Sequence, residues 1–143
     1  MSKLAIFGGE KAVKTINPDM TRWPIITEEE ETAVLDILRK GRMSEIDVTM
    51  KFEQEFADWI GVKYALATNN GTSSLMCAMY GVGLRKGDEL ICPTVTYWAS
   101  CLQAMALGAT VVFANVCKDT FCIDPDDIER KITDKTKMIV PVH

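Results

Sequence analysis

Apolar residues within 34–38 and within 52–60 recur every three or four residues, a spacing typical of helices with one inward face. Thr27 and Glu30 form a capping box, which predicts a helix that begins there and ends at Gly41. A second helix is predicted over 49–60, before Gly61. Its aromatic stripe, which indicates core packing, consists of Phe52, Phe56 and Trp59. This part of the chain is therefore predicted to be helical, behind a loop-rich N-terminal arm.

From residue 63 onward, short apolar runs alternate with helical segments. The runs predict strands at 64–67, 89–92, 110–115 and 138–142. The segments between and around them predict helices at 72–82, 97–107 and 125–132. Largely apolar strands that are joined through helices pair in parallel and are covered on both faces. The pattern therefore predicts an α/β fold in which helices cover a mostly parallel sheet.

Composition and charge restrict the classes of partner. The chain has 143 residues, of which 48% are hydrophobic and 25% charged, as in an ordinary globular protein with a core. Its formal net charge is -4 and no basic block occurs, which argues against nucleic acid or an anionic membrane as partner. The apolar run 4–7 is too short for a signal sequence or a membrane span. We therefore expect a cytoplasmic protein.

The cysteines and the histidine exclude several kinds of site. The five cysteines are Cys77, Cys92, Cys101, Cys117 and Cys122. Their number is odd and no Cys-x-x-Cys pair occurs, so reduced core thiols are expected rather than disulfides or a metal site. The only histidine, His143, is the last residue, which makes a Ser-His or Cys-His nucleophilic pair an improbable basis for catalysis.

Ligands of parallel sheets bind at the carboxyl ends of the strands. The candidate walls of such a site are 68–73, 93–98, 115–118 and His143. In the first wall a strand runs into Gly71 and a helix start, where backbone N–H groups and a partial positive charge attract anions. An ordinary N-cap with a turn glycine explains the local pattern alone. With Tyr97 at the next strand end, however, the arrangement suits a flat, phosphorylated heterocycle.

Short segments along nearly the whole chain resemble one protein family in collinear order. They are 7–12, 22–24, 52–57, 70–72, 87–93, 96–100, 108–113, 132–137 and 140–143. Together they resemble the sugar aminotransferases of the DegT/DnrJ/EryC1/StrS family, which use pyridoxal phosphate on the aspartate-aminotransferase-like fold. The resemblance implies a three-layer α/β/α arrangement, part of the large domain of a fold-type-I pyridoxal-phosphate enzyme. It further implies an N-terminal arm over 1–26 and an incomplete large cofactor-binding domain over 27–143.

The resemblance also implies roles for individual residues. Gly71, Thr72 and Ser73 match the family turn that holds the cofactor phosphate through backbone N–H groups and a hydroxyl. Ser73 stands where many members have alanine, which leaves a backbone contact intact. Tyr97 takes the aromatic position that stacks on the pyridine ring. These residues are the predicted cofactor-binding set.

Other residues near these motifs receive no ligand role. Trp98 is assigned to packing, and Asn70 is expected to support the turn. His143 follows a predicted strand beside the expected pocket, but a residue without a role explains it equally well. Lys135 and Lys137 match family sequence outside the catalytic site. The Schiff-base lysine and the acidic partner of the pyridinium nitrogen lie beyond this chain in the family, so we assign no catalytic residue.

The resemblance implies the N-terminal fragment of a homodimeric aminotransferase. The complete enzyme would move an amino group from an amino acid to a nucleotide-linked keto-sugar or a keto-cyclitol. The chain alone is expected to be inactive in this reaction. Three alternatives stay open: a dehydratase of the same family with histidine in place of the lysine, a non-catalytic regulatory module, and a fragment without activity.

Overall fold

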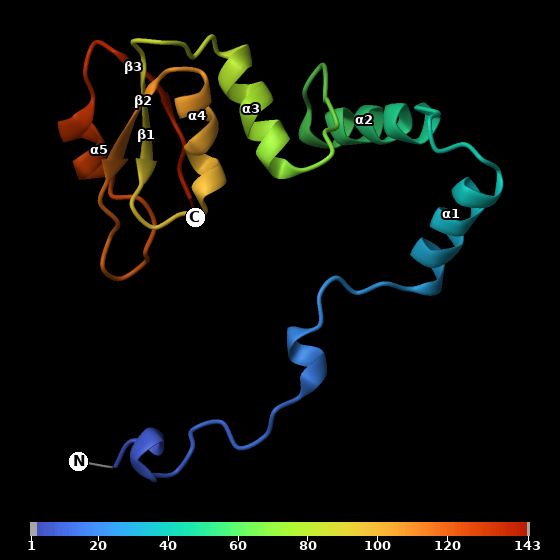
Figure 1. The fold of residues 1–143 in the computed structure, drawn as a ribbon, viewed down its shortest axis with the longest axis horizontal. Coiled ribbons are helices and arrows are strands. Elements are labelled where there is room, and N and C mark those ends of the chain that lie inside the picture. Colours follow the sequence, from blue (N-terminus) through green and yellow to red (C-terminus); the bar gives the residue numbers. More distant parts are fainter. Residues whose placement is uncertain (1–2, 143) are drawn as a thin grey trace. The chain divides into compact units, whose positions relative to one another are not determined.

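The computed structural model describes residues 3–142 (Figure 1). The chain divides into two compact units, Met1–Asp47 and Val48–His143. In the first unit, two short 3-10 turns (η1, Ala5–Phe7, and η2, Pro18–Thr21) precede helix α1, Glu28–Arg39. The predicted capping box is confirmed, because the Thr27 N–H donates to the Glu30 carboxylate at 2.8 Å.

The second unit contains the sheet and the other helices. After α2 (Asp47–Ile60), which starts at the boundary, they are α3 (Gly71–Gly81), β1 (Glu89–Pro93), η3 (Trp98–Ser100), α4 (Leu102–Ala106), β2 (Thr110–Ala114), α5 (Pro125–Lys131) and β3 (Thr136–Ile139). The three strands are parallel in the order β2-β1-β3. No helix within residues 3–142 is both long enough and apolar enough to cross a membrane.

The central strand β1 is covered on both faces. Leu90 and Cys92 are buried in a cluster with residues of α3 and α4, whereas Ile91 is buried in a second cluster against β2 and α5. Successive side chains of a strand point to opposite faces, so these clusters lie on opposite sides of the sheet. Figure 1 shows α4 and α5 on either side of the strands. The prediction of a three-layer α/β/α fold with a parallel sheet is confirmed.

The predicted strand at 64–67 is wrong for the structure as described. Tyr64 and Leu66 are exposed, and the Ala67 N–H donates to the Glu53 carboxylate at 2.8 Å instead of to a neighbouring strand. A strand requires a hydrogen-bonded partner. The sheet formed within residues 3–142 has three strands, and none of them pairs with this segment.

Two other boundaries also differ from prediction. The helix expected over 97–107 is divided into η3 and α4, because Cys101 has φ -137° and ψ -21°, outside the helical range. The last strand ends at Ile139 rather than continuing to residue 142. Its register places Thr136 beside Glu89, the first residue of β1, so this strand begins earlier than its apolar run suggests.

The expectation that the five cysteines are core thiols is correct for only two of them. Cys92 and Cys101 are buried, but Cys77 is exposed on α3, and Cys117 and Cys122 are half-buried in the loop after β2. Burial and the neighbouring Cys101 thiol raise the pKa of Cys92 to about 12. The apolar neighbours of a cysteine in the sequence do not determine its burial, because a cysteine on the outer face of a helix, such as Cys77, or in a loop still faces solvent.

Asp127 is a buried carboxylate that fixes the start of the loop after β2. Its carboxylate accepts from the Asn115 N–H at 2.7 Å, from Lys131 at 2.7 Å and from Arg130 at 3.0 Å. The Asn115 N–H, followed by the two cations, holds the pKa of Asp127 well below its usual range. A carboxylate so placed stabilises the fold only while it is ionised.

We expect Asp127→Asn to lower stability at neutral pH and to reduce the loss of stability in acid. In the unfolded chain the Asp127 carboxyl takes up its proton near its ordinary pKa of about 3.9, above its folded pKa. The contribution of Asp127 to stability is therefore complete above the unfolded pKa and is lost as the pH falls through the folded pKa. Urea unfolding of both proteins at a series of pH values measures this. Identical acid slopes for wild type and variant would contradict it.

Candidate functional site

Asn70 caps the first turn of α3. Its backbone is extended, with φ -168° and ψ 165°, and its side-chain oxygen accepts from the Ser73 N–H at 2.8 Å. The Ser74 N–H donates to the Asn70 carbonyl at 3.2 Å. The first bond satisfies a donor that a helix start otherwise leaves free, and the second is the first regular bond of the helix. Asn70 thus supports the turn, as its place in the sequence predicts.

The two backbone N–H groups between Asn70 and Ser73 remain available to a ligand. Within residues 3–142, the N–H groups of Gly71 and Thr72 donate to no protein acceptor. A Cβ added at Gly71 would meet no atom within 4 Å, so the approach to these donors is open. An anion there would also gain from the helix dipole of α3. The turn therefore fits a phosphate group through two backbone N–H groups. The Ser73 N–H is already bonded to Asn70, so Ser73 could contact the phosphate only through its side-chain hydroxyl.

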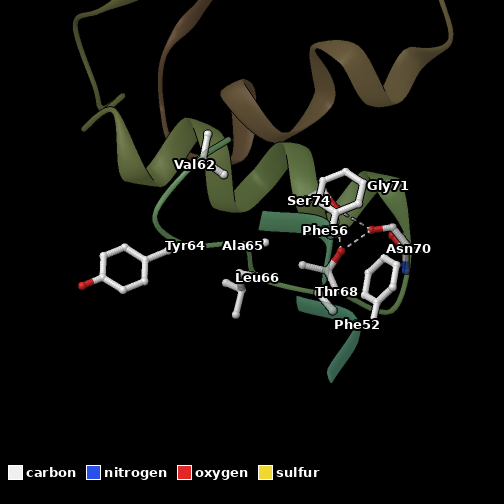
Figure 2. A pocket seen from close by; sticks show the side chains of 11 residues that line it. Phe52, Phe56, Val62, Tyr64, Ala65, Leu66, Thr68, Asn70, Gly71 and Ser74 are labelled. Carbon is white, nitrogen blue, oxygen red and sulfur yellow. Dashed lines mark hydrogen bonds between the residues drawn. The ribbon is translucent and has the colours of Figure 1, made fainter. Parts of the chain in front are cut away.

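A pocket of about 440 Å³ opens beside Gly71 (Figure 2). Figure 2 shows the rings of Phe52 and Phe56 near the polar side chains of Thr68, Asn70 and Ser74, while the Tyr64 side chain points away. The full lining is Phe52, Phe56, Val62, Tyr64, Ala65, Leu66, Ala67, Thr68, Asn70, Gly71 and Ser74. The pocket thus has an apolar wall from α2 and a polar edge at the start of α3.

Phe52 and Phe56 therefore do not pack in a core as their spacing predicts. Their exposed fractions are 54% and 42%, and that of Trp59 is 78%. Helical periodicity identifies the apolar face but not what covers it, and in the described part of the chain nothing buries this face.

Tyr97 lies on a different element from the turn. It directly precedes η3, at the loop after β1, and its ring contacts the Trp98 ring edge-on at a centroid distance of 5.8 Å. The turn η3 contacts α3. Helix α3 and strand β1 run in roughly opposite directions (Figure 1), so the start of α3 lies at the same end of the unit as the carboxyl end of β1.

The structure brings only part of the predicted set together. Gly71, Thr72 and Ser73 form one helical turn. Tyr97 is exposed at the same end of the unit but does not line the pocket beside Gly71. Residue 143 lies outside the described residues, so the strand-end role considered for His143 is not placed. The structure thus shows a helix start at Gly71 with two unbonded N–H groups, and an exposed Tyr97 ring on a neighbouring element.

The region that contains the helix start at Gly71 and the Tyr97 ring matches a known protein family. Residues 24–143 match the DegT/DnrJ/EryC1/StrS aminotransferase family. The chain belongs to this family.

Two curated relatives illustrate the likeness. The chain is 38% identical over 120 residues to the spore coat polysaccharide biosynthesis protein SpsC of Bacillus subtilis, covering 84% of the chain and 31% of SpsC. It is 37% identical over 128 residues to the L-glutamine:2-deoxy-scyllo-inosose aminotransferase of Streptomyces kanamyceticus, covering 85% of the chain and 30% of that enzyme.

A solved relative supports the fold. The structure of NtdA from Bacillus subtilis with bound cofactor PMP matches with a TM-score of 0.74 and 34% identity, over 82% of this chain and 28% of that one. The chain thus spans about a third of the length of the family members it matches. The fold of the matched region is that of the aspartate-aminotransferase-like enzymes.

Two hydrogen bonds at the site were not specified from the sequence. The first is the bond between Asn70 and the Ser73 N–H, which removes one predicted phosphate donor. An asparagine directly before a helix start is a signal for this bond, because it is a preferred N-cap residue. The second is the contact of the 62–70 segment with α2, where Glu53 holds the Ala67 N–H. A glutamate on an amphipathic helix gives no signal of that partner.

Proposed function

We propose that this chain is part of a pyridoxal-phosphate-dependent aminotransferase that transfers an amino group from an amino acid to a keto-sugar or a keto-cyclitol. The observation that carries the proposal is the match over residues 24–143, which includes the open helix turn at Gly71. The relative from Streptomyces kanamyceticus is named for the same class of reaction, with L-glutamine as donor and an inosose as acceptor. When bound, the cofactor supplies the electron sink, and the protein supplies position and electrostatics.

Each site residue has a distinct task in this proposal. The Gly71 and Thr72 N–H groups and the dipole of α3 bind the cofactor phosphate, and the Ser73 hydroxyl adds a donor. Tyr97 stacks on the pyridine ring. The two free N–H groups in the first turn of α3 support the first task, and the exposed ring at the carboxyl end of β1 supports the second.

The assembly and location proposed for the protein are a homodimer in the cytoplasm. The exposed apolar face of α2, with Phe52, Phe56 and Trp59, supports association, since large apolar patches mark interfaces. All five cysteines are free in the structure, which supports a reducing compartment.

A chimera tests the proposed reaction. Residues 24–143 replace the matching segment of a full-length family member, and amino transfer from L-glutamine or L-glutamate to a panel of keto-sugars and keto-cyclitols is followed by mass spectrometry. We expect aminated product to form, because the grafted segment supplies the phosphate turn and the stacking ring. The parental member is the control for assay conditions. A folded chimera that binds pyridoxal phosphate but aminates none of the panel would contradict the proposal.

A further inference from the structure

The loop after β2 folds back on itself as a small antiparallel hairpin. Val116 and Ile123 form an isolated antiparallel bridge. One position further in, the Cys117 N–H donates to the Cys122 carbonyl at 2.9 Å. Cys117 and Cys122 therefore lie directly opposite each other as the closing pair of the hairpin.

The tip of this hairpin is fixed by its own hydrogen bonds. The Phe121 N–H donates to the Cys117 carbonyl at 2.9 Å, and the Cys122 N–H to the Thr120 hydroxyl at 3.2 Å. Phe121 has φ 59°, the left-handed conformation that lets the chain reverse within the short segment 118–121. The backbone of the two cysteines is thus held in register before any bond joins their side chains.

This register places the two Cα atoms within the span of a disulfide. Opposite residues of an antiparallel pair have Cα atoms about 4.5–5.5 Å apart, and disulfides span about 4.4–6.8 Å. One backbone bond joins the pair, from the Cys117 N–H to the Cys122 carbonyl, so the Cβ atoms approach each other by a small adjustment at the hairpin tip as the bond forms. Side chains at opposite positions leave the hairpin on the same face. Both thiols are free and half-buried, so small reagents reach them, unlike the fully buried Cys92.

We propose that Cys117 and Cys122 form a redox-active dithiol that closes to a disulfide by exchange with a low-molecular-weight disulfide. One cysteine thiolate attacks a sulfur of the small disulfide, forms a mixed disulfide and releases the first small thiol. The second cysteine thiolate attacks the cysteine sulfur of the mixed disulfide and releases the second small thiol. The cysteines lose two electrons, the small disulfide gains them, and the two cysteine protons pass to the released thiolates. The exchange is reversible, as expected for cytosolic disulfides, and depends on the hairpin alone, independently of the proposed aminotransferase activity.

Mass spectrometry of the folded chain tests the pairing. The reduced protein is equilibrated with glutathione and oxidised glutathione, quenched in acid, alkylated and cut with trypsin. Lys118 lies between the two cysteines, so a Cys117–Cys122 disulfide joins peptides 87–118 and 119–130. We expect this linked pair to exceed the glutathione adduct of Cys122 by at least about tenfold, because the partner thiol is held at high effective concentration.

Variants and a denatured sample separate the geometry from simple reactivity. Cys117→Ser is expected to abolish the linked pair and leave Cys122 bound to glutathione, whereas Cys77→Ser leaves the pair unchanged. In concentrated urea, the ratio of the linked pair to the glutathione adduct of Cys122 is expected to be at least about tenfold lower than in the folded chain. The unfolded hairpin no longer aligns the two thiols. Equal pairing in urea, a glutathione adduct in place of the pair, or a link from Cys122 to Cys77, Cys92 or Cys101 would each overturn the proposal.

Discussion

Replacing Gly71 with valine is expected to weaken pyridoxal phosphate binding by about tenfold or more in a protein that carries the complete fold. A Cβ added at Gly71 meets no atom within 4 Å outside its own helix backbone and chain neighbours, so we expect the branched side chain to fit the free protein and to obstruct a phosphate that approaches the two free N–H groups. A hydrogen bond to a charged group contributes about 1.5–3 kcal/mol. Since about 1.4 kcal/mol corresponds to tenfold in affinity, the loss of one such bond accounts for the effect.

Gly81 provides the matched control for this variant. It ends the same helix, and a Cβ added there also meets no atom within 4 Å. Gly81→Val therefore introduces the same side chain at a similarly open position, remote from the phosphate turn. Cofactor affinity measured by fluorescence titration should fall in Gly71→Val and remain near wild type in Gly81→Val. Wild-type affinity in Gly71→Val would contradict the assignment of the turn.

Replacing Tyr97 with alanine is expected to lower cofactor affinity by about two- to tenfold, while Tyr97→Phe changes it little. Aromatic stacking contributes about 0.5–1.5 kcal/mol beyond the burial of area, and phenylalanine retains the ring. Tyr97 is 66% exposed in the structure, so its removal costs the fold little and the change in affinity reports on the ligand. Titration of the three proteins with pyridoxal phosphate measures the difference.

The neighbouring Trp98 provides the control for Tyr97. Its exposed fraction is 60%, and its ring contacts that of Tyr97 edge-on. Because we assign Trp98 to packing, Trp98→Ala should weaken cofactor binding less than Tyr97→Ala. Equal losses in Tyr97→Ala and Tyr97→Phe would instead implicate the phenolic hydroxyl. A larger loss of cofactor affinity in Trp98→Ala than in Tyr97→Ala would assign the stacking role to Trp98 instead.

Local patterns predicted the elements whose partners are also present in the described chain. The apolar runs at β1 and β2 pair with each other, and the capping box at Thr27 begins α1 as predicted. The helix predicted at 125–132 is α5, which Asp124 caps, with Pro125 at its first turn. In these cases, the residues that determine the element lie within it or beside it.

The errors arise where the structure depends on contacts distant in the sequence. The 64–67 run has the composition of a strand, but it pairs with none of the three strands formed within residues 3–142. Asp127 is recognised as a buried clamp only once Asn115 lies against it, 12 residues away in the chain. The pairing of Cys117 with Cys122 depends on the reversal at Phe121, a conformation that its residue type does not suggest.

The candidate site shows the same division. The strand–glycine–helix pattern predicted the helix start at Gly71, which is local. The use of the Ser73 N–H by Asn70 and the aromatic wall from α2 depend on side-chain geometry, which periodicity does not specify. The helix start at Gly71 was therefore predictable, whereas the number of free N–H donors in its first turn was not.

The measurement that tests the central claim most directly is amide NMR of the chain titrated with 4-deoxypyridoxine 5′-phosphate and with 4-deoxypyridoxine. Neither compound carries the aldehyde, so lysine adducts do not interfere, and the two differ only in the phosphate. If the first turn of α3 binds the cofactor phosphate, the largest shifts with the phosphorylated compound occur at the Gly71 and Thr72 amides, the free donors of the turn. The compound without phosphate leaves these amides unshifted. Equal shifts with both compounds, or shifts that leave Gly71 and Thr72 unaffected, would contradict the account.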